Sequence, residues 1–134
     1  MDETEPRVQD DDEVCLLVPP HSCHLRAVRL VAAEAGGRAG LDVSELDDLR
    51  IAVDELCYMV MAATDQRLLV RVVVRDGRVV VRGNGQLRAG TPAPSLPNVS
   101  ELIVDAVSDR YVFAQDGDRL SFVVVKQAGR TVSA

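Results

Sequence analysis

The clearest pattern of apolar and polar positions lies between residues 44 and 63. Apolar residues recur every three or four positions on one stripe, at Leu46, Leu49, Val53, Leu56 and Val60. This spacing is typical of a helix that buries one face. Ser44 with Asp47 three residues later has the pattern of a capping box, in a stretch whose acids favour the positive end of a helix dipole. We therefore expect a helix that runs to Ala63, about 30 Å long at 1.5 Å per residue.

A second strong pattern predicts a β-hairpin over residues 67–82. Two Val-rich runs flank Asp76-Gly77, the residue pair preferred in a type I′ turn. A two-residue turn sets the register of the strands that it joins. The predicted cross-strand pairs are Arg75 with Arg78, Val74 with Val79, Val72 with Val81, and Arg71 with Arg82. The face predicted to be buried holds Val70, Val72, Val74, Val79 and Val81.

The other face of this hairpin carries four arginines around Val73 and Val80. An antiparallel sheet with one packed and one wet face produces such a pattern. Like charges directly opposite each other cost stability. The arginines are therefore relieved by nearby acids or used by an acidic partner, unless they are simply a solvated sheet face.

The remaining elements are shorter and are bounded by Pro and Gly. A strand over 14–18 stops at Pro19-Pro20, and a helix capped by Ser22 is ended by Gly36-Gly37. A loop over 83–97 precedes a third helix that starts at Asn98. A second hairpin is predicted over 110–115 and 119–126, around residues 116–118. The order predicts an α+β fold: a two-layer sandwich of a mixed, mostly antiparallel sheet with three helices on one face.

Composition and charge divide the chain into a body and two tails. The 134 residues are 47% hydrophobic but only 3% aromatic, so the core must consist of Val, Leu, Ile and Ala. Residues 1–13 hold seven acids against Arg7, which equals the whole net charge of −6 and leaves a neutral body. We expect one domain over 14–126, a disordered acidic tail over 1–13 and a C-terminal tail over 127–134. The acidic tail is interpreted either as a solubilising segment or as a mimic of an acidic ligand.

These features exclude several classes of function. A neutral body with an acidic arm lacks the concentrated Lys and Arg that nucleic-acid binding needs. No run approaches the roughly 20 apolar residues of a membrane span, and the acidic start differs from a secretory leader. Three cysteines without framework spacing suit reduced thiols in the cytoplasm, and no set of Cys and His completes a zinc site. Cys57, on the apolar helix, is expected to be a small core residue.

The order of elements and the run ELDDLRIAVDELCYMVMAA over 45–63 resemble the histidine-kinase-like ATPases. Within that superfamily the chain is most similar to the anti-sigma-factor serine kinases, over roughly residues 14–126. The resemblance implies an N box, in which a Glu and an Asn one helical turn later hold water and Mg²⁺. Glu55 matches the Glu, but the Asn position is Met59. A thioether is a poor ligand for Mg²⁺, which prefers hard oxygens.

Two further family motifs are also incomplete. The family's Asp-x-Gly-x-Gly, which binds adenine, corresponds to Gly83-Asn84-Gly85-Gln86-Leu87, where only Gly85 agrees. Asn84 could offer a carbonyl to adenine, one residue out of register. The Gly-rich lid corresponds to residues 89–98, which hold one glycine and three prolines. Proline removes backbone donors that a phosphate would need. The resemblance therefore implies a degenerate nucleotide site, with ATP and Mg²⁺ as cofactors only if that site works.

Three functions follow from the resemblance. The first is an anti-sigma-type binding protein that holds a sigma factor, meets an anti-anti-sigma antagonist and could form a homodimer, with Arg26 and Arg29 at the partner surface. The second is an ATP-dependent serine kinase that phosphorylates the antagonist through Glu55. The third is a noncatalytic sensor, whose cleft either takes another small ligand or is packed shut by Met59, Met61 and Leu87. We expect the first.

Overall fold

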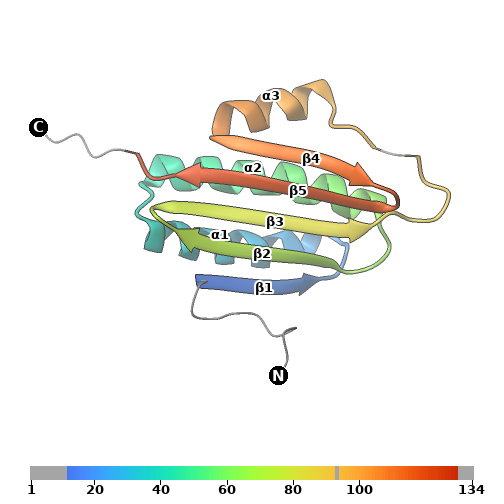
Figure 1. The fold of residues 1–134 in the computed structure, drawn as a ribbon, viewed down its shortest axis with the longest axis horizontal. Coiled ribbons are helices and arrows are strands. Elements are labelled where there is room, and N and C mark those ends of the chain that lie inside the picture. Colours follow the sequence, from blue (N-terminus) through green and yellow to red (C-terminus); the bar gives the residue numbers. More distant parts are fainter. Residues whose placement is uncertain (1–11, 93, 130–134) are drawn as a thin grey trace, which may run out of the picture.

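The computed structural model describes residues 12–92 and 94–129. Its elements combine one five-stranded sheet with three α-helices and a short 3-10 turn at Ser22–His24, so the α+β class is confirmed. The helices are α1 (Leu25–Ala39), α2 (Val43–Ala63) and α3 (Asn98–Val107). The strands are β1 (Asp12–Val18), β2 (Leu68–Arg75), β3 (Arg78–Gln86), β4 (Arg110–Asp116) and β5 (Arg119–Gln127). Figure 1 shows the strands side by side with the helices behind and above them.

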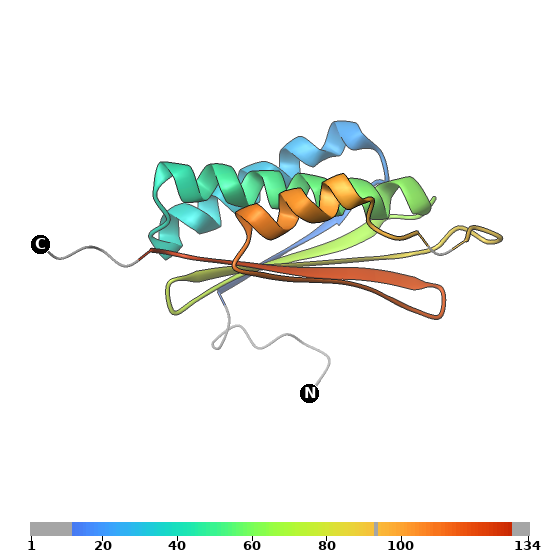
Figure 2. The same ribbon diagram turned by 90° about the horizontal axis from the view of Figure 1, so that it is seen from above.

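The sheet has the strand order β1-β2-β3-β5-β4, and each of its four pairs is antiparallel. The expected mixed sheet is therefore wrong for the described strands, because α1 and α2 together return the chain so that β2 runs against β1. All three α-helices lie on one side of the sheet, as in a two-layer arrangement (Figure 2). Within the described residues, no helix is long and apolar enough to cross a lipid bilayer.

The first hairpin has the predicted register, with Arg75 opposite Arg78 and Arg71 opposite Arg82. Asp76 and Gly77 both have positive φ, at 52° and 72°, as a type I′ turn requires. However, β3 does not end at residue 82 but continues to Gln86, paired with β5 along its whole length. The predicted loop therefore begins four residues too early, because pairing with a strand distant in sequence extends β3 through glycines.

Helix α1 contradicts the prediction that Gly36-Gly37 ends it. The helix runs to Ala39, and its C-cap is Gly40, with φ of 91°. A Cβ atom on Gly36 would lie 2.4 Å from Leu46 Cδ2. Gly36 thus lets α1 approach the start of α2 instead of breaking the helix. Ser22 also lies in the 3-10 turn before α1 and does not cap the helix.

The capping box of α2 is real but lies two residues earlier than predicted. Asp42 is the N-cap, and its Oδ1 accepts a hydrogen bond of 2.8 Å from the Glu45 backbone N–H. Glu45 Oε1 in turn accepts one of 2.8 Å from the Asp42 N–H. Ser44 and Asp47, the predicted pair, lie inside the helix, which ends at Ala63 as predicted.

The ends of the domain extend further than the sequence indicates. Asp12 and Glu13, assigned to the acidic tail, belong to β1 and pair with β2. At the other end, the Ala128 N–H donates to Gly77 O at 2.8 Å, and the Gly129 N–H to Glu45 Oε2 at 2.7 Å. The rest of the two predicted tails, 1–11 and 130–134, lies outside the described residues.

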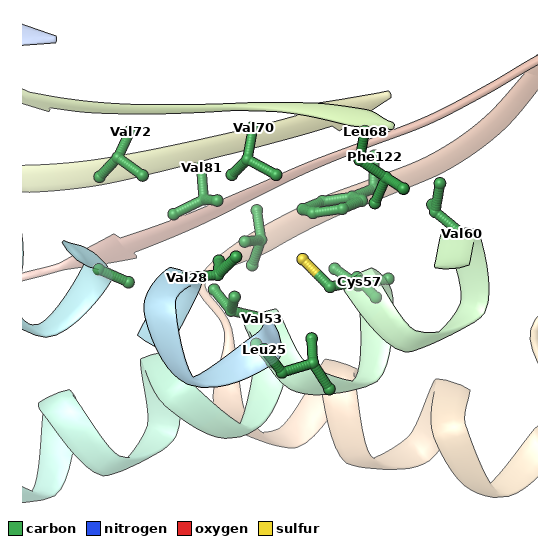
Figure 3. Packing of buried hydrophobic residues seen from close by; sticks show 14 of the residues in the cluster. Leu25, Val28, Val53, Cys57, Val60, Leu68, Val70, Val72, Val81 and Phe122 are labelled. Atoms are coloured by element: carbon green, nitrogen blue, oxygen red, sulfur yellow. The ribbon is translucent and has the colours of Figure 1, made fainter. Parts of the chain in front are cut away.

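Valine and leucine fill the core between sheet and helices, as the composition requires, with one large ring from Phe122. Figure 3 shows this ring between the strands and α2, near Val60 and Cys57. Cys57 is fully buried, which confirms its expected role in the core. Burial, assisted by the charge of Asp54, raises the pKa of the Cys57 thiol to about 12.

Candidate functional site

The two glycines at the positions of the family's adenine motif lie on the inner face of β3. A Cβ atom on Gly83 would lie 2.4 Å from Phe122 Cε2 and 2.7 Å from its Cζ. A Cβ atom on Gly85 would lie 3.0 Å from Val60 Cγ1. The absence of side chains at these positions therefore makes room for a core ring and for α2, and that space is filled by protein.

Asn84 lies on the opposite face of the sheet from the helices. Neighbouring residues of a strand point to opposite faces, and Gly83 and Gly85 face the core. The Asn84 Oδ1 accepts a hydrogen bond of 2.8 Å from Arg119 Nη1. The structure thus does not bring Asn84 together with the other family positions.

The chain that leaves β3 is attached to the end of α2. The Arg88 N–H donates to Ala63 O at 2.9 Å, and the Arg88 guanidinium donates to Ala62 O at 3.1 Å and Thr64 O at 3.4 Å. These carbonyls are the acceptors that a helix leaves unsatisfied at its C-terminus, where a cation is also favoured. Leu87, just before Arg88, is buried. The segment after β3 therefore covers the C-terminal end of α2.

Glu55 and Met59 lie on the flank of α2 that faces α3 and β5. Both are half-buried, and they share this flank with Asp48, two turns before Glu55. The Asp48 carboxylate accepts a hydrogen bond of 3.3 Å from Lys126 Nζ of β5. The same Nζ donates to Val107 O, the last residue of α3, at 3.1 Å. The structure thus places Glu55 and Met59 one turn apart on α2, as the spacing predicts.

Met61 does not join this flank. It is buried on the other side of α2, where it lines a depression with His21, Cys23 and Tyr58. Of the three side chains expected to fill the cleft, Met59 lies beside Glu55 and Leu87 is buried after β3. A larger depression, of about 590 Å³, lies at β4 and is lined by residues that include Leu96, Tyr111 and Phe113.

The side chains at these positions do not fit a magnesium nucleotide. Met59 offers sulfur where the family has an amide oxygen, and Mg²⁺ requires oxygen ligands. The space that Gly83 and Gly85 leave is taken by Phe122 and Val60. Among the residues with described coordinates, no three His, Cys, Asp or Glu side chains come together as a metal site.

A different surface gathers exposed apolar and basic residues, on the outer side of α1 and α2. The Arg29 Nη1 donates to Asp54 Oδ2 at 2.9 Å, which ties the two helices together. Around this pair, Arg26, Leu30, Ala33 and Arg50 line a depression of about 240 Å³ that Arg29 also borders. We name this the α1–α2 face: Arg26, Arg29, Leu30, Ala33, Arg50, Ile51, Asp54 and Tyr58.

The sequence pointed to Arg26 and Arg29 as a partner surface, which stays a prediction, but did not point to the other residues of the α1–α2 face. Asp54 is 25 residues from Arg29, and no pattern along the chain links them. Its other oxygen, Oδ1, is buried and has no hydrogen-bond partner within the described residues. A signal existed for Ile51 and Tyr58, which are two turns apart on α2 and lie off its apolar stripe.

Comparison with protein-family models gave no match, and a search of curated proteins gave no significant match.

Proposed function

We propose that this protein is an anti-sigma-factor-like regulator that holds a sigma factor on its α1–α2 face and does so without ATP. The observation that carries the proposal is the set of apolar side chains left outside the core there. Leu30 is 65% exposed, Tyr58 55% and Ile51 43%. The core of the domain is complete without them, so their apolar surface is available to a partner.

The chemistry of the α1–α2 face suits a protein partner. Protein interfaces are enriched in Tyr and Arg, which combine a large apolar body with a polar end. Here Tyr58 and Leu30 supply apolar area, while Arg26 and Arg50 supply donors for acidic or carbonyl groups of a partner. An anti-anti-sigma antagonist that competes for the same face would release the sigma factor without any transfer of phosphate.

The packing of the nucleotide positions favours binding over catalysis. Met59, one turn after Glu55, has no amide oxygen, and core side chains fill the space beside the glycines of β3. Sequestration of a sigma factor requires only a one-to-one complex, so the proposed activity does not need a nucleotide site. Titration calorimetry with millimolar Mg²⁺·ATP checks this directly: we expect no heat of binding, whereas saturable heat would favour the serine kinase.

The function is tested by capture from an extract of the protein's own host. Tagged wild-type protein should retain a sigma factor, identified by mass spectrometry. The variant Leu30→Asp should lose at least about tenfold in affinity, since a charge in an apolar contact costs more than 1.4 kcal/mol. The matched control is Leu17→Asp, because Leu17 is 62% exposed on β1, away from the helices, and should retain the sigma factor. Failure to capture any sigma factor would refute the function, and equal capture by both variants would refute the face.

The role of Arg29 needs a charge-exchange experiment. Arg29→Glu alone would place two carboxylates together, because Arg29 already pairs with Asp54. The double variant Arg29→Glu with Asp54→Arg restores an ion pair of opposite direction, and a partly exposed pair is worth about 0.2–1 kcal/mol. If Arg29 contacts the partner, the double variant regains thermal stability but not sigma binding. Recovery of both would show that Arg29 only joins the helices.

A further inference from the structure

The outer face of the β2–β3 hairpin holds a basic groove that no described helix covers (Figure 2). Arg71 lies opposite Arg82 and Arg75 opposite Arg78, so four guanidinium groups occupy two rungs of the sheet. Val73 and Val80 form the apolar rung between them. Together with Glu13 these residues line a depression of about 250 Å³, which we name the arginine groove.

Like charges on opposite strands destabilise a sheet unless an anion lies between them. The arginine groove already contains one such anion. The Arg71 Nε donates to Glu13 Oε2 at 2.7 Å, and its Nη2 donates to Glu13 Oε1 at 3.2 Å. This two-point contact leaves the Glu13 side chain only 9% exposed. Two parallel donors on one carboxylate are the arrangement by which arginine binds acidic side chains strongly.

The chain before Glu13 is placed to supply more carboxylates. β1 runs antiparallel to β2, with Asp12 beside Val74, so β1 begins at the end of the hairpin that carries Arg75 and Arg78. This segment contains five acids, Asp2, Glu3, Glu5, Asp10 and Asp11, against Arg7. Eleven residues reach up to about 36 Å when extended, and the groove spans only about 13 Å of strand. Length and charge therefore both allow the segment to lie along the groove.

We propose that the acidic segment 1–11 docks intramolecularly in the arginine groove and neutralises it. The ligand and its site then belong to one chain, and the pairing of Glu13 with Arg71 shows the same kind of contact within the groove. Docking keeps the basic face from binding other anions and relieves the repulsion between the paired arginines.

The test uses a nitroxide on Thr4→Cys, in a chain whose exposed Cys15 and Cys23 are replaced by Ser. Nitrogen-15 spectra report the amide intensities of Val73 and Val80. At about 0.01 M salt the Debye length is near 30 Å, and at 1 M it is near 3 Å. We expect both amides to lose intensity at low salt and to recover it at high salt. Unchanged intensity at low salt would overturn the proposal.

Two full-length variants separate the charge of the segment from that of the groove. Neutralising the segment uses Asp2→Asn, Glu3→Gln, Glu5→Gln, Asp10→Asn and Asp11→Asn. Neutralising the groove uses Arg78→Gln with Arg82→Gln, matched in charge by Arg26→Gln with Arg50→Gln on the α1–α2 face. Both the segment and groove variants should abolish the intensity loss, and the matched control should retain it. An intensity loss that persists in the segment variant would refute recognition by the groove. So would an intensity loss that vanishes in the matched control as well as in the groove variant.

Mixing distinguishes the chain's own segment from that of a second copy. Nitroxide-labelled protein without nitrogen-15 is combined with unlabelled protein carrying nitrogen-15. We expect no intensity loss in the mixture, because docking is intramolecular. Loss at Val73 and Val80 in the mixture would assign the groove to a second molecule and overturn the proposal.

Discussion

Substitution of Gly83 by Ala tests whether the glycines of β3 serve the core or a nucleotide. The added Cβ would lie 2.4 Å from Phe122 Cε2, 2.7 Å from Cζ and 3.2 Å from Cδ2. The first two distances are shorter than any normal carbon contact, and the ring is only 1% exposed, so it has little room to move. Added volume in a packed core costs about 1–3 kcal/mol.

Urea unfolding followed by circular dichroism measures this cost. With a slope of about 1–3 kcal/mol per molar urea, the midpoint should fall by on the order of 1 M. Gly37→Ala is the control, since nothing lies within 4 Å of its added Cβ in α1. The free energy of unfolding of Gly37→Ala should instead rise by about 0.5–1 kcal/mol, because Ala has a higher helix propensity than Gly.

A double-mutant cycle identifies the ring as the cause. Phe122→Leu costs stability alone, but it removes the atoms that the new methyl group would meet. The double variant should therefore lose less free energy of unfolding than the two single variants lose in sum, by about 0.5–3 kcal/mol. An unchanged midpoint for Gly83→Ala, or costs that simply add, would refute the packing explanation and reopen β3 as a ligand site.

Two further predictions concern α2. Asp42→Ala should lower the free energy of unfolding by about 0.5–2 kcal/mol, because the Glu45 N–H loses its acceptor. Ser44→Ala should change the free energy of unfolding by less than about 0.5 kcal/mol. Urea unfolding of both variants decides which residue is the cap. Burial raises the pKa of the Cys57 thiol from 9.0 to about 12, so the folded state retains the proton that the unfolded state loses. Stability from this group is complete below pH 9 and should fall between pH 9 and 12, at about 1.4 kcal/mol per pH unit. Cys57→Ala should lack this part of the pH dependence, and identical slopes in the two proteins would contradict it.

Local patterns determined the elements whose geometry depends on neighbours in the chain. The hairpin register followed from Asp76-Gly77, because a two-residue turn leaves the strands only one alignment. The length of α2 followed from its apolar stripe. Caps and ends were less certain, since Asp42 and Ser44 both offer a side-chain oxygen near the helix start and only the backbone geometry selects one.

The roles of the glycines depended on contacts that no local pattern contains. Gly36 was predicted to end α1, but it lies inside the helix against Leu46. Gly83 and Gly85 were predicted to start a loop, but pairing with β5 holds them in β3. A glycine suits a turn, a close approach or a ligand equally well, so its neighbours in space decide among the three.

The sequence alone thus determined the α+β class and most of the helices and strands, because these depend on residue type and short-range spacing. Only the tertiary structure decided the strand order, the separation of Asn84 from the helix side, and the ion pairs Arg29–Asp54 and Arg71–Glu13. The partners in those pairs are 25 and 58 residues apart. These residues come together only when the sheet and the helices pack into layers. That packing is driven by burial of apolar surface, which is non-directional and so leaves no local sequence pattern that links the partners.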